Sequence, residues 1–131
     1  MKVIVDTDVW SEAFRKEGAK GDYVLELRTL VEDSRVQLIG PIRQEILCGI
    51  RGEKQFEQIE ERISAFPDKA VDSEVYVLAA KFYNLCRSKG VQGSNTDFLI
   101  CACSVVWGYP ILTKGHFEKP GKWIIGIEIA I

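Results

Sequence analysis

The sequence predicts an α/β fold with three layers, in which helices cover both faces of a mostly parallel central sheet of four or five strands. Short apolar runs at 2–5, 36–39, 109–113 and 123–127 have the length and composition of buried strands. Longer segments with apolar residues at helical spacing lie between these runs. Strands that alternate with helices form parallel sheets covered by helices, which is why we expect this architecture.

The length and composition predict a single globular domain over residues 1–131. Of these residues, 47% are hydrophobic and 27% are charged, as is usual for a globular protein. No apolar run approaches the roughly 18 residues that span a bilayer, and Asp6 follows the start too closely for a signal peptide. We therefore expect a cytoplasmic protein without membrane contact. The formal net charge of −2 argues against nucleic-acid binding by bulk positive charge.

The first half of the chain alternates strand and helix. The first β-branched run ends at Asp6, and apolar residues then recur with helical spacing over 9–14. A loop over 17–21 separates this helix from a second one, for which Asp22 is the expected N-cap. The second helix ends before Ser34, ahead of the second strand.

The second half of the chain is mostly helical. Pro41 is suited to the first turn of a helix that Gly52 closes, and amphipathic helices follow over 53–66 and 72–89. A loop leads into a nearly buried helix that begins near Asp97. The candidate N-caps of this helix are Ser94, Asn95 and Thr96.

The cysteines and the single histidine indicate neither a zinc cage nor a disulfide framework. The sequence contains no C-x-x-C pair, and the histidine lies outside any ligand pattern. We expect reduced and mostly buried thiols. The residues concerned are Cys48, Cys86, Cys101, Cys103 and His116.

Three acidic residues are candidates for chemistry. Asp6 ends the first strand, and ligands of open α/β sheets bind beyond the carboxyl ends of strands, although capping of the next helix explains Asp6 equally well. Asp97 lies where a helix dipole favours a carboxylate, and capping alone also accounts for it. Glu45, taken by itself, is best explained as an exposed charge on a helix.

These acids lie in segments that match the motifs of a known family in order and spacing. The segments are Val5-Asp6-Thr7-Asp8-Val9-Trp10, Gln44-Glu45-Ile46-Leu47-Cys48-Gly49, Asn95-Thr96-Asp97-Phe98-Leu99-Ile100, and Leu112-Thr113-Lys114 with Phe117 nearby. Together they resemble the PIN-domain family, and especially its VapC-type toxins, over essentially the whole chain. The resemblance implies a metal-dependent endoribonuclease, the toxin of a type II VapBC toxin–antitoxin pair. Such an enzyme hydrolyses RNA phosphodiester bonds through a carboxylate-bound Mg²⁺ or Mn²⁺.

The resemblance also implies roles for single residues. Asp6, Glu45 and Asp97 would be the catalytic acids. Asp6 and Asp97 would bind the metal, and Glu45 would hold metal-bound water. Side chains around these acids, which orient them or add charge, would be Thr7, Thr96 and Asp8.

Three kinds of partner are expected. RNA phosphates need local cations, and the candidates are Arg43, Arg51, Lys114 and Lys122. The resemblance implies a homodimer and a small cognate antitoxin, which would reach toward the acids with a basic side chain. The apolar residues between 41 and 66 are the expected surface for either protein contact.

The sequence departs from the family at the fourth acid. This acid usually follows the threonine after the penultimate strand, but here the segment is Thr113-Lys114-Gly115-His116-Phe117-Glu118. Asp8 or Glu118 would have to supply the missing charge.

Two alternatives stay open. A haloacid-dehalogenase-type phosphatase would use Asp6 as nucleophile and Asp8 as acid, but the sequence offers no late acidic pair for magnesium. A catalytically silent PIN-like module that binds RNA or protein would explain the absent fourth acid.

Overall fold

The central sheet is built around β1 (Val3–Val5), the first strand of the chain. It pairs in parallel with β2 (Val36–Gln37) on one side and with β3 (Ile111–Thr113) on the other. A fourth strand, β4 (His116–Glu118), pairs antiparallel with β3, so the strand order is β2-β1-β3-β4. All of β1 is buried, as expected of a β-branched strand with a neighbour on each side. The predicted parallel sheet is therefore confirmed for three strands.

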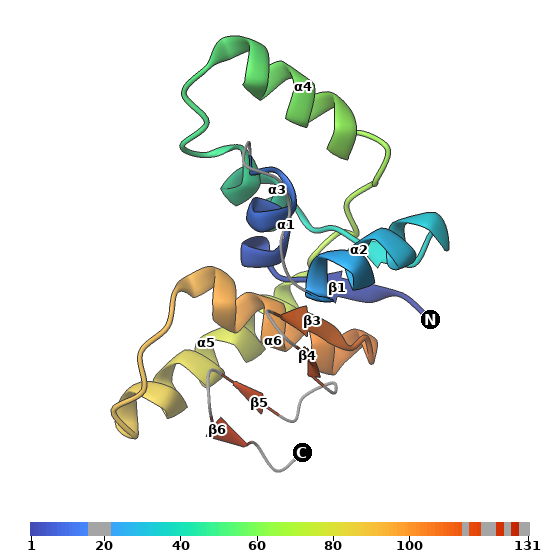
Figure 1. The fold of residues 1–131 in the computed structure, drawn as a ribbon. Helices are drawn as coiled ribbons and strands as arrows, with labels where there is room; N and C mark the ends of the chain where they lie inside the picture. Colours follow the sequence, from blue (N-terminus) through green and yellow to red (C-terminus); the bar gives the residue numbers. More distant parts are fainter. Residues whose placement is uncertain (16–21, 114–115, 119–122, 125–126, 129–131) are drawn as a thin grey trace.

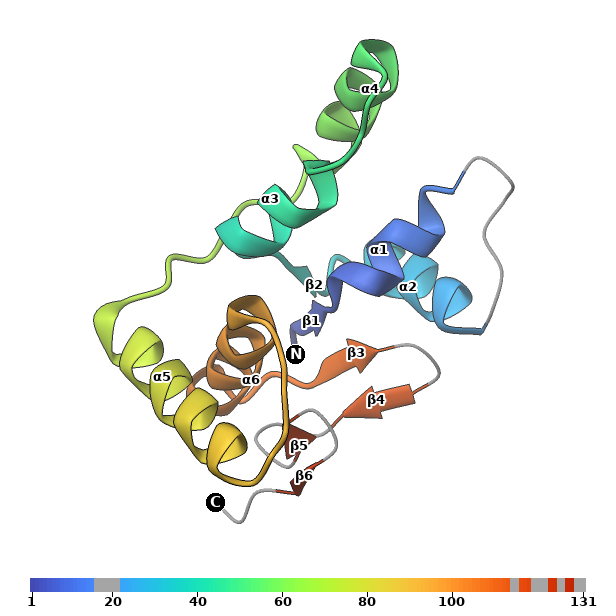
Figure 2. The same ribbon diagram turned by 90° about the vertical axis from the view of Figure 1, so that its left-hand side faces the viewer.

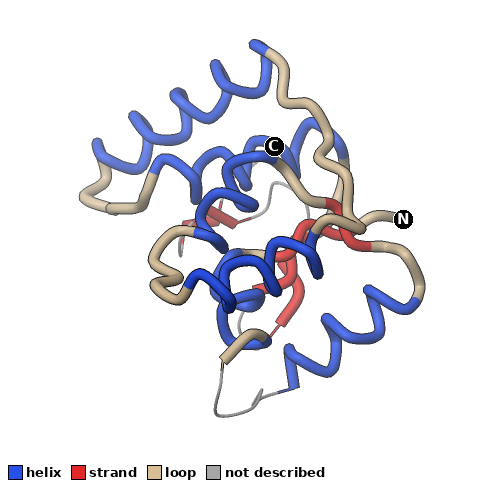
Figure 3. The backbone as a smooth tube through the Cα atoms, turned by 90° about the horizontal axis from the view of Figure 1, so that it is seen from above, coloured by secondary structure: helices blue, strands red, loops and turns tan. Residues whose placement is uncertain are grey.

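The computed structural model describes residues 1–15, 22–113, 116–118, 123–124 and 127–128. Its helices are α1 (Thr7–Ala13), α2 (Asp22–Glu32), α3 (Gly40–Leu47), α4 (Glu53–Ile63), α5 (Ser73–Ser88) and α6 (Asn95–Trp107). Figure 2 shows α1 and α2 on one side of the sheet and α5 and α6 on the other, which gives the three predicted layers. The strands lie among the helices in Figure 3, and α4 lies farthest from the sheet in Figure 1. In this described part of the chain, no helix is long and apolar enough to cross a membrane.

The helix α6 runs through the hydrophobic core and fixes the position of Asp97. Every residue from 98 to 104 is buried, as expected of a helix that is apolar on all sides. Ser94 caps its first turn, and Gly108 ends it in the left-handed conformation at φ 71°. Asp97 is therefore anchored to the most buried helix of the described fold.

Several predicted boundaries were wrong. The helix expected to close at Gly52 ends at Leu47, because the chain turns at Gly49 with φ 84°, a conformation that favours glycine. The last predicted helix begins at Asn95, so Asp97 is its third residue and not its start. The run 36–39 forms a ladder with β1 only over its first two residues.

The C-terminal strand prediction was also wrong in its pairing. Residues 123–127 were expected to form one strand of the parallel sheet. In the described residues, β5 (Trp123–Ile124) pairs antiparallel with β6 (Ile127–Glu128) as a separate two-stranded sheet. β4 was not predicted, because its run of three residues carries no clear alternation to distinguish it from a loop.

The expectation for the cysteines is confirmed. Cys86, Cys101 and Cys103 are buried, whereas Cys48 is exposed after α3. The described residues contain no disulfide.

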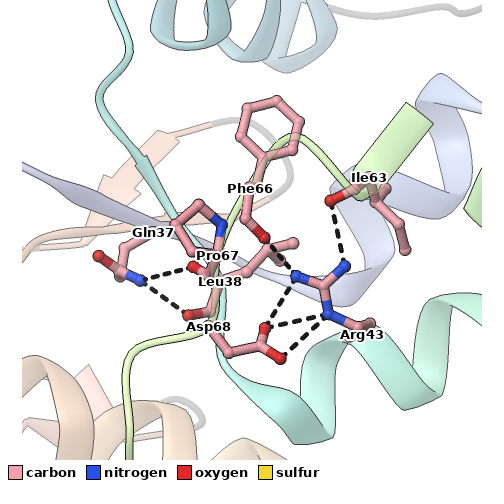
Figure 4. Close-up of polar contacts among 7 residues, drawn as sticks. All are labelled: Gln37, Leu38, Arg43, Ile63, Phe66, Pro67 and Asp68. Atoms are coloured by element: carbon pink, nitrogen blue, oxygen red, sulfur yellow. Dashed lines mark hydrogen bonds and ion pairs between the residues drawn. The ribbon is translucent and has the colours of Figure 1, made fainter. Parts of the chain in front are cut away.

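A guanidinium group fixes the end of α4 against α3 (Figure 4). Arg43 of α3 donates from Nε to both carboxylate oxygens of Asp68 at 3.1 Å. Its other nitrogens donate to the backbone carbonyls of Ile63, at 3.1 Å, and Phe66. The last carbonyls of a helix lack partners within the helix, and a cation near that end is electrostatically favoured. Arg43 therefore stabilises the connection that leads from α4 toward α5.

Replacement of Arg43 tests this structural role. We expect Arg43→Met to lower the free energy of unfolding by about 1–3 kcal/mol, because it leaves half-buried carbonyls and a carboxylate without their donor. Urea unfolding followed by circular dichroism measures the loss. The control is Arg51→Met, which removes an exposed arginine and should change stability by less than about 0.5 kcal/mol. Equal effects of the two substitutions would contradict the role assigned to Arg43.

Candidate active site

Asp6 lies at the carboxyl end of the central strand. Its backbone N–H donates to the carbonyl of Leu112 on β3 at 3.0 Å, which holds the ends of β1 and β3 side by side. Asp6 occupies the N-cap position of α1, but its side chain makes no capping hydrogen bond. Its backbone carbonyl instead accepts from the N–H of Val9 at 3.0 Å. Capping, one of the two explanations for Asp6, therefore does not account for its carboxylate.

Thr7 connects Glu45 to the end of β1. Its hydroxyl Oγ1 donates to Glu45 Oε1 at 2.9 Å, across 38 positions of sequence. Thr7 is the first residue of α1 and Glu45 lies in α3, two helices that pack together. This hydrogen bond holds an exposed helix glutamate next to the residue that follows Asp6. The sequence predicted both residues but not the bond between them.

Asp97 forms a capping box at the start of α6. Its Oδ2 accepts from the Ser94 N–H at 3.0 Å, and its own N–H donates to Ser94 Oγ at 3.1 Å. The capping explanation for Asp97 is thus correct for one carboxylate oxygen. The negative charge of Asp97 also raises the pKa of Asp6, so this carboxylate lies near enough to Asp6 to act on it while it caps its own helix.

The electrostatics of Asp6 show that several carboxylates surround it. Burial is the largest cause that raises its pKa, to about 6, and the negative charges of Asp8, Asp97 and Glu45 raise it further. A hydrogen bond from the backbone of Thr7 lowers the pKa by less than Asp8 or Asp97 raises it. Among the described residues, no lysine or arginine is one of the groups that lower it. The site is therefore a partly buried concentration of negative charge.

This donor set fits a hard divalent cation. Carboxylate oxygens are the ligands that Mg²⁺ and Mn²⁺ prefer, and a cation would relieve the repulsion that raises the pKa of Asp6. In the part of the chain that the structure describes, no group of three Asp, Glu, His or Cys side chains is arranged to coordinate a metal ion together. Mg²⁺ usually keeps several waters and uses one or two protein carboxylates, so a cage of three is not required.

Curated relatives identify the family. No family model matches the sequence. The chain is 30% identical over 116 residues to a VapC ribonuclease of Mycobacterium bovis, an alignment that covers 86% of this chain and 85% of the relative. Ribonuclease VapC11 of Mycobacterium tuberculosis matches with the same identity and the same coverage. The chain belongs to the VapC ribonuclease family.

Solved structures show the same fold for this VapC-family chain. It aligns with the VapBC2 structure of Rickettsia felis bound to a DNA fragment from the promoter with a TM-score of 0.68, at 15% identity and 85% coverage of each chain. It aligns with FitAcB of Neisseria gonorrhoeae with a TM-score of 0.66, at 18% identity, covering 83% of this chain and 84% of the other. The predicted α/β fold of PIN-domain type is therefore confirmed.

The fold also bears on the missing fourth acid of the VapC pattern. The segment that departs from the pattern includes 114–115, which lie outside the described residues. Glu118 pairs with Ile111 in the β3–β4 ladder, whereas Thr113 at the end of β3 pairs with His116. Glu118 is thus two pairs away from the strand end beside Asp6. Asp8, whose charge raises the pKa of Asp6, is the better placed of the two replacements.

The remaining predicted residues are not all brought to the acids. Thr96 is half-buried in the first turn of α6, where it lines a pocket against α5. The guanidinium of Arg43 is engaged by Asp68 and by backbone carbonyls, which leaves it poorly suited to an RNA phosphate. Arg51 is exposed beyond the end of α3. Lys114 and Lys122 lie outside the described residues.

The raised pKa of Asp6 predicts a pH-dependent cost of its charge. The folded protein holds the Asp6 proton more tightly than the unfolded chain does, so stability falls as pH rises from about 4 to 6. In EDTA at pH 7.5, we expect Asp6→Asn to raise the free energy of unfolding by about 1–3 kcal/mol. At pH 4, near the pKa of an unfolded aspartate, most of the difference should disappear.

Urea unfolding at the two pH values measures this effect. Glu57→Gln, on the exposed side of α4, is the matched control and should leave stability unchanged at both. A less stable Asp6→Asn variant at pH 7.5 would show that the carboxylate has a structural role.

Proposed function

We propose that this protein is a metal-dependent endoribonuclease and the toxin of a VapBC-type toxin–antitoxin pair. The observation that carries the proposal is the gathering of Asp6, Asp8, Glu45 and Asp97 at one strand end without a described countercharge. Family membership supports the same activity, because the curated relatives are named as ribonucleases. The phosphatase alternative loses its support, since the chain belongs to a different family from the one it requires.

Each acid has a distinct task in this proposal. Asp6 and Asp97 would hold Mg²⁺ or Mn²⁺, with the second oxygen of Asp97 available beside the one used for capping. The bound cation would supply an activated water and stabilise charge on the scissile phosphate. Glu45, held at Oε1 by Thr7, keeps its other oxygen for orienting a water molecule. Asp8 adds negative charge at the exposed side of Asp6.

A small antitoxin is the proposed protein partner. Support comes from the VapBC2 structure, a toxin–antitoxin assembly with the same fold. A basic side chain of the partner would be attracted to the uncompensated acids around Asp6. The homodimer stays a prediction. The apolar surface expected between 41 and 66 is largely buried or half-buried. Among the described residues, the exposed large apolar side chains are Met1, Leu25, Val31, Tyr76, Val77, Leu85 and Val106.

RNA cleavage tests the activity directly. Purified, partner-free protein should cleave a mixed structured RNA in Mg²⁺ or Mn²⁺, and EDTA should abolish cleavage. Asp6→Asn and Asp97→Asn should each lower the rate by at least about 100-fold, because they remove charge that binds the cation. Glu57→Gln should cleave at the wild-type rate. Absence of cleavage with either metal would support the silent binding module instead.

Replacement of Thr7 tests whether it positions Glu45. Thr7→Val keeps the shape of the side chain but removes the hydroxyl, and we expect a loss of about 10- to 100-fold in cleavage rate. Thr7→Ser keeps the hydroxyl and should retain most of the activity. Because Glu45→Gln removes the charge that the hydroxyl holds in place, adding Thr7→Val to it should cost little more. A full additional loss in the double variant would indicate that Thr7 acts independently of Glu45.

A further inference from the structure

A pocket of about 490 Å³ opens between α5 and the first turn of α6. Pro41, in the first turn of α3, forms part of its wall. Asn95 and Thr96 line it from α6, and Asp97 is the next residue of the same turn. The residues that line the pocket on α6 thus flank, in sequence, one of the acids of the candidate active site. Figure 2 shows α5 and α6 running side by side where it lies.

The shape of the pocket comes from the sequence of α5. Tyr76, Ala79, Ala80 and Tyr83 follow one another at helical spacing, so they lie along one face of the helix. The two alanines carry no bulk beyond Cβ and leave a hollow between the two aromatic rings. Phe98 of α6 closes the hollow from within the core.

The two tyrosine rings are not equivalent. Tyr83 is half-buried, its ring meets Phe98 edge to face at 5.5 Å, and the Arg87 guanidinium lies 5.3 Å from its centroid. Tyr83 therefore forms a side of the pocket, and its contacts with Phe98 and Arg87 hold its ring in place. Tyr76 is 51% exposed although it is a large aromatic residue, so its ring is free to stack with a ligand.

Polar groups complete the pocket. Asn84, Asn95 and Thr96 line it and offer amide and hydroxyl groups that both donate and accept hydrogen bonds. Flat aromatic surface combined with such groups is how proteins recognise unstacked bases of single-stranded RNA. None of the described residues that line the pocket is charged, so we expect the phosphate backbone of a bound RNA to lie outside it.

We propose that this pocket binds one unpaired base of the RNA substrate, stacked on Tyr76, while the adjoining backbone lies at the acids around Asp6. The inference rests on the proposed ribonuclease function and adds a specificity site to it. The protein would then require a single-stranded nucleotide next to the phosphate that it cleaves. Tyr76 is a binding residue here and takes no part in the chemistry.

The test compares RNA with and without bases. Fluorescence anisotropy would measure binding of a short oligoadenylate, and of an abasic ribose-phosphate strand of the same length, to the non-cleaving Asp6→Asn protein. In that background, Tyr76→Ala removes the stacking ring, and Ala80→Leu fills the exposed part of the hollow. Each should weaken oligoadenylate binding by about 5- to 100-fold and leave binding of the abasic strand unchanged.

Two controls separate stacking from general damage. Tyr76→Phe keeps the ring and should bind oligoadenylate like the parent. Val77→Ala removes an equally exposed apolar side chain that does not line the pocket, and it should also bind like the parent. Thermal unfolding of every variant verifies that the fold is retained.

The remaining outcomes overturn the inference. Unchanged oligoadenylate binding by both Tyr76→Ala and Ala80→Leu would exclude a base in the pocket while leaving the ribonuclease proposal intact. A base in the pocket would also be excluded if both variants changed only the self-association of the protein, measured by analytical ultracentrifugation. This face of α5 would then be an interface between two copies of the protein. If the wild-type protein neither cleaves nor binds RNA, the proposed function fails together with the pocket.

Discussion

The structure depends on the parallel pairing of β1 with a neighbour on each side. Val3–Val5 is completely buried between β2 and β3, so its backbone groups must be satisfied by these two strands. This pairing leaves Asp6 where the strand stops and α1 begins. Because the neighbouring strand ends at the same edge, side chains from distant segments meet there. The position of the candidate site therefore follows from the parallel pairing of β1 with its two neighbours.

The acids at this edge are placed by local structure that serves two purposes. Ser94 and Asp97 cap α6 with a pair of hydrogen bonds, and the charge of the same carboxylate raises the pKa of Asp6. Thr7 begins α1 and holds Glu45 through its hydroxyl. Stable helix starts thus provide the rigidity that a binding site needs. The unfavourable charge of Asp6 is tolerated because the well-packed core around β1 and α6 offsets it.

Positive charge is used differently from negative charge in this chain. Arg43 bonds to Asp68 and to the carbonyls at the end of α4, which makes it part of the scaffold (Figure 4). Arg87 lies over Tyr83 beside the aromatic pocket. The described surface at the acids is left without an arginine or lysine that lowers the pKa of Asp6. A cation or a basic partner is what this arrangement favours.

The sequence by itself determined the fold class and most of the helices, because periodicity is a local property. It proposed Asp6, Glu45 and Asp97 as a set of acids through the resemblance to the PIN-domain family. For each of these residues a structural explanation, capping or an exposed helix charge, was at least as good as the functional one. Tertiary structure added their proximity, since the Thr7–Glu45 bond joins segments 38 positions apart and the charges that act on Asp6 come from three segments. It also showed that the guanidinium of Arg43, an RNA-contact candidate, is engaged within the scaffold by Asp68. These contacts between distant residues depend on how the helices and strands pack together, and local sequence patterns do not encode that packing.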